Sequence, residues 1–336
     1  MWKELQQKFD KENLSEVIES LPNQFSQAFD EVAIKISEKT EKIFICGMGG
    51  SALPANLLKT YLNCVPNFNI QIEIVRDYTL PKYIDEKWAG FFMSYSGNTE
   101  ETLSALDHAE SKGIKNITIM AHGGKLKSIA QGKGYNVVKI PDTKQPRMSY
   151  GYTVGSFLKI FNNSGLTEID LTELSDNASK AQDQNDVIQK EAQALAERIK
   201  GKIPIIYSSN KWRYVSMVWK INFNENSKTQ SFWNAIPEMN HNELVGYTNI
   251  LADYYIIAIN DPDSLESIQK RMTTLKEVLK DKTEVEIIQM QNGSVFYKMI
   301  TSLLLGLWTS YYLALLNKVD PTPVDMVENF KKLLTK

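Results

Sequence analysis

The feature that most constrains the fold is an alternation between short apolar runs and segments with helical periodicity. In the first half the apolar runs are KIFICG, IQIEIVRD, GFFM, NITIMAH and YNVVKIPD, which begin at residues 42, 70, 90, 116 and 135. In the second half KIPIIYSSN, DYYIIAIND and EVEIIQM begin at residues 202, 253 and 284. Strand-like runs that alternate with helices are typical of βαβ units and parallel sheets. The alternation therefore predicts an α/β protein.

Two such alternations suggest two domains. A chain of 336 residues is longer than one hydrophobic core usually serves. The polar, helix-prone stretch that begins at residue 163 separates the two series of strands. We therefore predict a first domain over residues 1–160, a linker and helix over 161–195, and a second domain over 196–336. Each domain is predicted to be a parallel sheet flanked by helices on both faces, a three-layer αβα arrangement.

Composition excludes several classes of protein. A net charge of −2, from 38 basic and 40 acidic residues without long runs of one sign, argues against a nucleic-acid partner. Two cysteines and three histidines give neither a disulfide framework nor a zinc site, so we expect a cytoplasmic protein without a metal. The N-terminus has no apolar core of a signal peptide. The apolar stretch 300–316 is too short to span a bilayer and predicts a buried helix, so no membrane partner is expected.

A glycine-rich loop at the end of the first strand predicts a phosphate site. The stretch KIFICGMGGSALPANLL, residues 42–58, runs from a strand through three glycines into a helix. Gly47, Gly49 and Ala52 satisfy the dinucleotide pattern G-x-G-x-x-G/A, and Asp77 ends the next strand at a loose spacing. A Walker loop is excluded because no Gly-Lys-Ser/Thr follows. This loop by itself leaves a dinucleotide and a sugar phosphate both open.

A second loop favours a small phosphomonoester. SYSGNTEET, residues 94–102, again follows an apolar strand and opens a helix. Ser94, Ser96 and Thr99 offer hydroxyls, and backbone N–H groups at a helix N-terminus attract anions. The alternative is helix capping by Thr99, and the two roles are compatible.

These motifs are similar to those of a known family. The pairing of GMGGSA with SYSGNTEETLSA resembles the sugar isomerase (SIS) domain. With PRMSYGY, NENSK, PEMNHNELVG and DPTPVDMVENFKKLL, which begin at residues 146, 224, 237 and 320, the chain resembles the bifunctional phosphoglucose/phosphomannose isomerase family. That resemblance covers nearly the whole chain. It implies two SIS domains, and conversion of fructose 6-phosphate to glucose and mannose 6-phosphates through an enediolate, with no cofactor. It also implies a homodimer with the active site at the interface, where the partner subunit contributes the histidine equivalent to His241.

The resemblance assigns roles residue by residue. It implies that the substrate phosphate is bound by Gly49, Gly50, Ser51, Ser94, Ser96 and Thr99. Glu225 is then the base that moves a proton between C1 and C2, since a carboxylate can perform this transfer. His241 opens the sugar ring, with His122 as its rival. The neighbours Asn240, Asn242 and Glu243 are polar groups that could fix its tautomer. Arg147 stabilises the enediolate. Lys331, with Lys332 beside it, is the implied lysine of the C-terminal helix.

Two further expectations follow from the second half. IIYSSNKW, residues 205–212, keeps two serines but lacks the Gly-Asn-Thr turn, so we expect one phosphate site per chain. The rival functions are a non-catalytic sugar-phosphate sensor and another SIS isomerase that acts on a different sugar phosphate. Glu225, His241 and Arg147 together favour the enzyme, because a sensor does not need acid and base groups.

Overall fold

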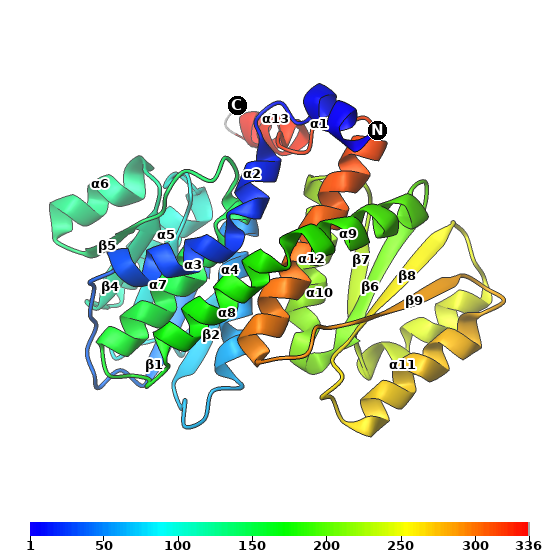
Figure 1. Cartoon of the computed structure of the whole chain (residues 1–336). Coiled ribbons are helices and arrows are strands. Elements are labelled where there is room, and N and C mark those ends of the chain that lie inside the picture. Colours follow the sequence, from blue (N-terminus) through cyan, green and yellow to red (C-terminus); the bar gives the residue numbers. More distant parts are fainter. Residues whose placement is uncertain (335–336) are drawn as a thin grey trace. The chain divides into compact units, whose positions relative to one another are not determined.

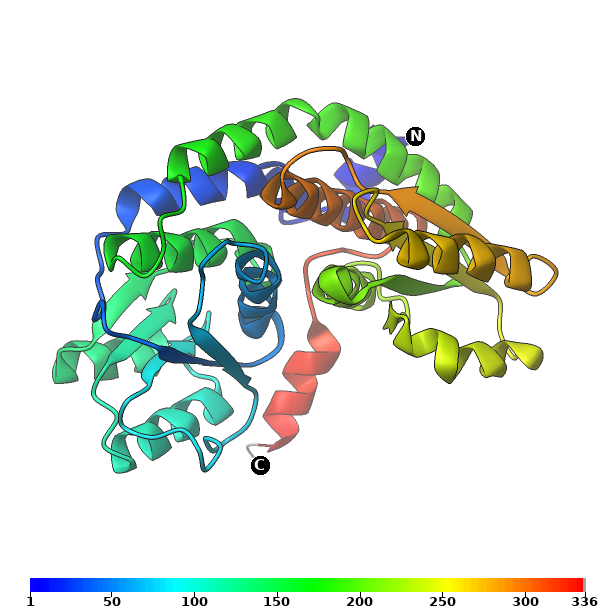
Figure 2. The ribbon, with the colours of Figure 1, turned by 90° about the horizontal axis from the view of Figure 1, so that it is seen from below.

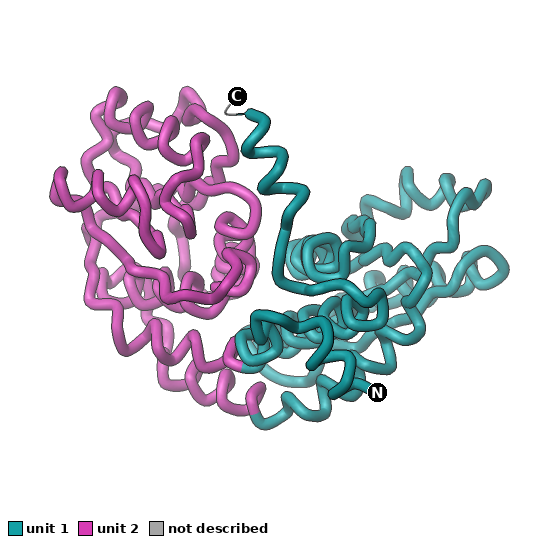
Figure 3. Tube along the Cα trace, turned by 90° about the horizontal axis from the view of Figure 1, so that it is seen from above, with its two compact units in different colours: residues 1–19, 183–336 teal, residues 20–182 magenta. Residues whose placement is uncertain are grey.

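The chain forms two compact units, which Figure 3 colours separately. In a computed structural model that describes residues 1–334, unit 2 comprises Ser20–Gln182, and unit 1 comprises Met1–Glu19 together with the chain from Asp183 onward. Each unit contains one sheet, and every strand pair in both sheets is parallel. The prediction of an α/β protein with two parallel sheets is confirmed.

The sheet of unit 2 has five strands in the order β2-β1-β3-β4-β5. Its strands are β1 (Lys42–Gly47), β2 (Gln71–Val75), β3 (Ala89–Met93), β4 (Ile117–Ala121) and β5 (Asn136–Lys139). The chain leaves β1 toward one edge of the sheet and returns at β3 to continue toward the other. This reversal separates the connections that follow β1 and β3, which is where ligands bind in open α/β sheets.

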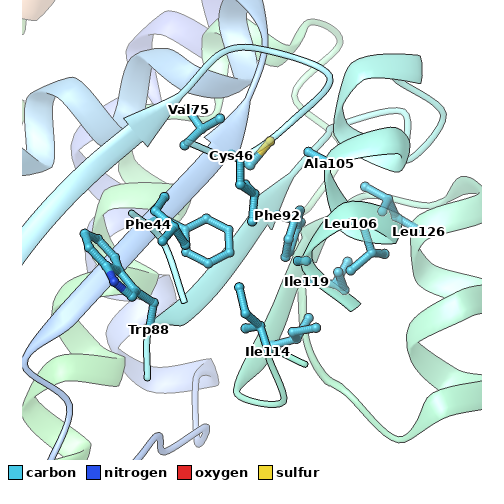
Figure 4. Close-up of a cluster of buried hydrophobic side chains, with 14 of the residues drawn as sticks. Phe44, Cys46, Val75, Trp88, Phe92, Ala105, Leu106, Ile114, Ile119 and Leu126 are labelled. Atoms are coloured by element: carbon cyan, nitrogen blue, oxygen red, sulfur yellow. The ribbon is translucent and has the colours of Figure 1, made fainter. Parts of the chain in front are cut away.

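Helices cover both faces of this sheet (Figures 1 and 2). Adjacent residues of a strand point to opposite faces. Accordingly, Phe91 contacts Phe157 of α7 (Tyr150–Asn163), with ring centroids 4.9 Å apart. Phe92 belongs to a buried cluster with Leu106 of α5 (Glu100–Ser111) and Leu126 of α6 (Gly124–Lys133). Figure 4 shows this cluster, in which the Phe44 and Phe92 rings meet edge to face. The helices of unit 2 are α3 (Leu21–Glu31), α4 (Gly49–Leu62), α5 (Glu100–Ser111), α6 (Gly124–Lys133), the 3-10 turn η1 (Pro146–Met148), α7 (Tyr150–Asn163) and α8 (Leu171–Asp183).

The sheet of unit 1 has four strands in the order β7-β6-β8-β9, so β6 and β8 are its central pair. Its strands are β6 (Ile203–Ser209), β7 (Phe232–Ile236), β8 (Tyr254–Asn260) and β9 (Glu284–Gln289). Its helices are α1 (Trp2–Phe9), α2 (Leu14–Glu19), α9 (Asn185–Ile199), η2 (Asn210–Trp212), α10 (Arg213–Glu225), η3 (Glu238–His241), η4 (Glu243–Thr248), α11 (Glu266–Leu279), α12 (Val295–Leu316) and α13 (Asp325–Leu334).

Helix α12 is the central helix of unit 1. Its 22 residues include the apolar stretch 300–316, and it is the one described helix long and apolar enough to cross a membrane. However, 94% of its most apolar window is buried, and it packs against α9 and α10. The prediction of a buried helix is confirmed, although the helix is longer than the apolar stretch suggested.

The boundaries of the units differ from the predicted domains 1–160, 161–195 and 196–336. The first 19 residues group with unit 1 because α1 and α2 pack on α12, where the buried Tyr311 hydroxyl donates to Asp10 Oδ2 at 3.0 Å. Residues 161–182, which lie in the predicted linker and helix, belong to unit 2 and include most of α8. The sequence does not predict strand β7, which lies at the sheet edge and has three of its five side chains exposed or half-buried.

Candidate active site

The two predicted phosphate loops are neighbours in unit 2. Gly47 at the end of β1 pairs with Met93 at the end of β3, so the loops that follow these strands start side by side. Helix α4 begins two residues after β1, and α5 begins after the SYSGNT turn. The glycine loop and the hydroxyl-rich loop therefore meet at the point where the strand order reverses.

Hydrogen bonds link the predicted hydroxyls. The hydroxyls of Ser94 and Thr99 lie 2.8 Å apart, and Ser51 Oγ accepts a hydrogen bond from the backbone N–H of Tyr95 at 3.1 Å. Ser94 is fully buried, so its hydroxyl contacts Thr99 from the interior side of the turn. Ser96 is exposed, and its Oγ accepts from the N–H of Asn98 at 3.3 Å. The loop connections thus gather all four hydroxyl residues around one turn.

The Thr99 side chain does not cap helix α5, which was the alternative role for this residue. Thr99 is the N-cap residue of α5, but its hydroxyl bonds to Ser94 and makes no cap hydrogen bond. The N-cap residue of α4 is Met48, whose side chain cannot accept one. Both helices therefore begin without side-chain caps, and the free N–H groups of a first turn are suited to binding an anion.

The glycines of the first loop bring Arg147 to the same place. Gly49 has φ +48°, a conformation that favours glycine. A Cβ on Gly50 would lie 2.8 Å from the backbone nitrogen of Arg147, so only glycine lets α4 and η1 approach this closely. Arg147 itself is fully buried, and its Nη1 donates to Gln145 Oε1 at 3.1 Å.

Sequence reasoning missed the part played by Tyr95. Its hydroxyl donates to Asp142 Oδ1 at 2.9 Å and accepts from the N–H of Thr143 at 2.8 Å. The backbone N–H of Lys144 and then the Tyr95 hydroxyl hold the pKa of Asp142 below its ordinary value. Tyr95 therefore ties the SYSGNT turn to the segment that leads into Arg147. Its place between two predicted phosphate-binding serines was the available signal.

His122, the rival histidine, lies beside this tyrosine. Its ring stacks on Tyr95 with centroids 5.3 Å apart, and its Nδ1 lies 3.0 Å from the Ile140 carbonyl oxygen. Because a carbonyl only accepts, Nδ1 carries the proton in this arrangement when the ring is neutral. His122 is exposed at the carboxyl edge of the sheet of unit 2.

Glu225, His241 and Lys331 belong to unit 1. Glu225 is the half-buried last residue of α10. The turn that follows it is well anchored, because Asn226 Nδ2 donates to Ser310 Oγ at 2.9 Å and Ser227 Oγ donates to the Phe223 carbonyl at 2.6 Å. Lys228 Nζ donates to the backbone carbonyl of Glu225 at 2.6 Å. These contacts fix the backbone that carries the Glu225 carboxylate.

His241 is exposed at the end of η3, and its polar neighbours bond to residues other than the histidine. Asn242 donates to Glu238 Oε1 at 2.7 Å, and Asn240 Oδ1 accepts from Arg271 at 3.4 Å. Glu243 accepts hydrogen bonds from the hydroxyl of Tyr207, at 2.5 Å, and from Asn234 Nδ2, at 2.6 Å. Glu243 thus anchors the loop that carries His241 to the sheet, a role that its sequence neighbours did not reveal.

Lys331 lies on the exposed helix α13, where its Nζ pairs with Glu328 Oε1 at 2.8 Å. The same helix exposes apolar side chains, which are Met326, Val327, Phe330, Leu333 and Leu334. Among residues 1–334, no group of three His, Cys, Asp or Glu side chains is placed to hold a metal ion.

Comparison with known proteins places the chain in a family. A curated bifunctional phosphoglucose/phosphomannose isomerase from Caldicellulosiruptor bescii is 34% identical over 335 residues, which cover 95% of this chain and 98% of that protein. The chain belongs to the bifunctional phosphoglucose/phosphomannose isomerase family. Residues 188–334 match the family model described as the bacterial phospho-glucose isomerase C-terminal SIS domain.

Two other similarities concern a relative with a different name and the fold. A D-glucosamine-6-phosphate 4-epimerase from Sulfolobus acidocaldarius is 32% identical over 226 residues, which cover 67% of this chain and 70% of that protein. A solved structure of a hypothetical protein from Thermus thermophilus aligns with a TM-score of 0.78 at 16% identity, covering 99% of this chain and 92% of the other. The second similarity concerns the fold alone.

Proposed function

We propose that this member of the bifunctional isomerase family interconverts fructose 6-phosphate with glucose 6-phosphate and mannose 6-phosphate. The observation that carries the proposal is the hydroxyl-rich turn between two uncapped helix N-termini, in a chain 34% identical over nearly its full length to such an enzyme. A terminal phosphate has three oxygens that accept hydrogen bonds, and this turn offers both hydroxyl and backbone donors.

In the proposed mechanism the phosphate anchors the sugar and the chain then moves a proton. His241 protonates the ring oxygen as the ring opens. Glu225 removes the proton from C1 of open-chain fructose 6-phosphate, and the electron pair moves through the C1–C2 bond to the oxygen on C2. Arg147 and Lys331 stabilise the resulting enediolate. Glu225 then returns its proton to C2 on either face, and the proton of the C1 hydroxyl is transferred to the C2 oxygen, which gives the two aldoses. The sugar undergoes no net oxidation or reduction, so the proposal includes no redox cofactor.

The proposal extends to assembly and location. We propose a homodimer whose interface completes the active site, with His241 reaching the sugar bound by the partner subunit. Support comes from α13, the helix that carries Lys331, where Met326 and Phe330 are 86% and 61% exposed. Exposed apolar side chains of this kind are expected at a surface that binds a second copy of the chain. Two free cysteines agree with a cytoplasmic location.

The first test follows both products from fructose 6-phosphate, with EDTA present, in separate coupled dehydrogenase assays. Both aldose phosphates should form, and Glu225→Gln should lower kcat by at least about 10²-fold, because it removes the base. Glu277→Gln, a change on the exposed face of α11, is the matched control and should keep wild-type activity. Full activity of Glu225→Gln would remove this glutamate from the mechanism.

A different sugar phosphate is the second candidate, favoured by the similarity to the epimerase that is named for D-glucosamine 6-phosphate. Incubation with that amino sugar and chromatography of the products tests it directly. Turnover of the amino sugar without turnover of fructose 6-phosphate would replace the proposed substrate. If fructose 6-phosphate raises Tm but is not converted, the chain is a sensor.

A further inference from the structure

The two sheets place different residues at equivalent positions. In unit 1 the chain leaves β6 toward β7 and returns at β8, so the strand order reverses between β6 and β8 as it does between β1 and β3 in unit 2. Ser94 is the first residue after β3, and Asp261 is the first residue after β8. Where unit 2 has a hydroxyl turn, unit 1 therefore has a carboxylate.

Four donors surround the Asp261 carboxylate. Its Oδ1 accepts from Lys298 Nζ at 2.5 Å and from the backbone N–H of Asp263 at 3.1 Å. Its Oδ2 accepts from the indole N–H of Trp212 at 2.8 Å and from Lys211 Nζ at 3.1 Å. The donors come from the segments after β6 and β8 and from α12. Two ammonium groups, a backbone N–H and a side-chain N–H form the kind of donor set that binds phosphate or carboxylate ligands.

The site is buried and charged. The side chain of Asp261 has no exposed surface, and that of Lys298 is 2% exposed. Burial alone would raise the pKa of Asp261, but the hydrogen bonds from Lys298 and Trp212 hold the pKa at about 2. Burial would likewise lower the pKa of Lys298, and the hydrogen bonds to Asp261 and Asp263 raise it instead. Asp261 and Lys298 are therefore both charged at neutral pH, and the attraction between them offsets the free-energy cost of removing each charge from water.

We propose that unit 1 contains an anion site at its strand-order reversal whose resident anion is the Asp261 carboxylate. The chain thus fills this site itself, so unit 1 takes no ligand phosphate. Removal of the carboxylate leaves two ammonium groups, Lys298 and Lys211, beside the single carboxylate of Asp263, which pairs with Lys298 at 2.5 Å. The remaining positive charge opens a site for a small free anion. The proposal concerns anion binding and stands whether or not the chain is an isomerase.

The test compares Asp261→Ala with Asp261→Asn in the full-length protein. Alanine leaves space for an anion, whereas asparagine fills that space without charge and is the matched control. Tm is measured in chloride, formate and inorganic phosphate at constant ionic strength, and phosphate stoichiometry is measured by isothermal titration calorimetry. At tenfold excess over Kd, formate or phosphate should raise the Tm of Asp261→Ala by roughly 3–5 °C beyond the rise in wild type. Asp261→Ala should also bind one more phosphate per chain than wild type and Asp261→Asn.

The outcomes separate an anion site from an ordinary ion pair. Equal Tm shifts and equal stoichiometry in wild type and Asp261→Ala would overturn the proposal. If Asp261→Ala does not fold in chloride, its refolding from urea is measured in formate and in chloride. Recovery of folded protein in formate alone supports the anion site, and failure in both anions rejects it.

Discussion

Replacement of Gly97 by alanine tests whether the SYSGNT turn positions the substrate phosphate, as we propose. Gly97 has φ +67°, and a Cβ at this position would lie 1.8 Å from the carbonyl oxygen of Gly123, where real Cβ atoms keep at least 3.0 Å. The turn must therefore move by at least 1.2 Å, the difference between these two distances. That movement strains two hydrogen bonds, from His122 N to Tyr95 O at 3.0 Å and from Leu126 N to Gly97 O at 2.9 Å.

The size of the effect follows from those contacts. A left-handed residue with a side chain costs about 1 kcal/mol, and two weakened backbone hydrogen bonds cost about 1 kcal/mol each. We therefore expect Gly97→Ala to lose about 3 kcal/mol of unfolding free energy. Because a displacement near 1 Å moves the phosphate anchor, kcat/KM for fructose 6-phosphate should fall about 10²-fold.

Gly113→Ala is the matched control. Gly113 has φ +77° but nothing within 4 Å of the position of a Cβ, so alanine there has the same backbone strain without the clash. It should lose about 1 kcal/mol and keep wild-type kcat/KM. Urea denaturation measures the free energies, and the coupled assay measures the rates. If Gly97→Ala and Gly113→Ala have the same kcat/KM, the turn does not position the substrate phosphate.

Two other predictions concern unit 1. Tyr207→Phe removes the hydroxyl that donates to the Glu243 carboxylate and should lower the unfolding free energy by about 1.5–3 kcal/mol, as measured by urea denaturation; an unchanged midpoint would exclude an anchoring role for this pair. The pKa of Asp261 in the folded chain is about 2, against an ordinary value of 3.8. The ionised carboxylate therefore stabilises the fold above pH 4, and this stabilisation is lost as the pH falls toward 2. It amounts to about 2 kcal/mol, so the difference in stability between wild type and Asp261→Asn should shrink over that range, and a pH-independent difference would contradict the ion pair.

Much of the candidate site could be predicted because its signals are local. The strand ahead of each loop, the glycines at Gly49 and Gly97 and the hydroxyls of Ser94 and Thr99 all lie within two short stretches. Since parallel strands bring their carboxyl ends to one edge, both loops were expected at the same edge of the sheet. The pairing of β1 with β3 then makes them neighbours. The sequence alone also indicated that α12 is buried, because its apolar residues extend all around the helix.

The tertiary structure decided whatever depends on residues distant in sequence. Tyr95 reaches Asp142 across 47 positions, Tyr207 reaches Glu243 across 36, and Tyr311 reaches Asp10 across 301. No periodicity or motif encodes such pairs, because each exists only after the strands have chosen their neighbours. Local signals, by contrast, determined that this chain forms two parallel sheets with a hydroxyl-rich turn in the first. Only folding determined that the N-terminal helices join the second sheet, and that a buried aspartate fills the position which a serine holds in the first.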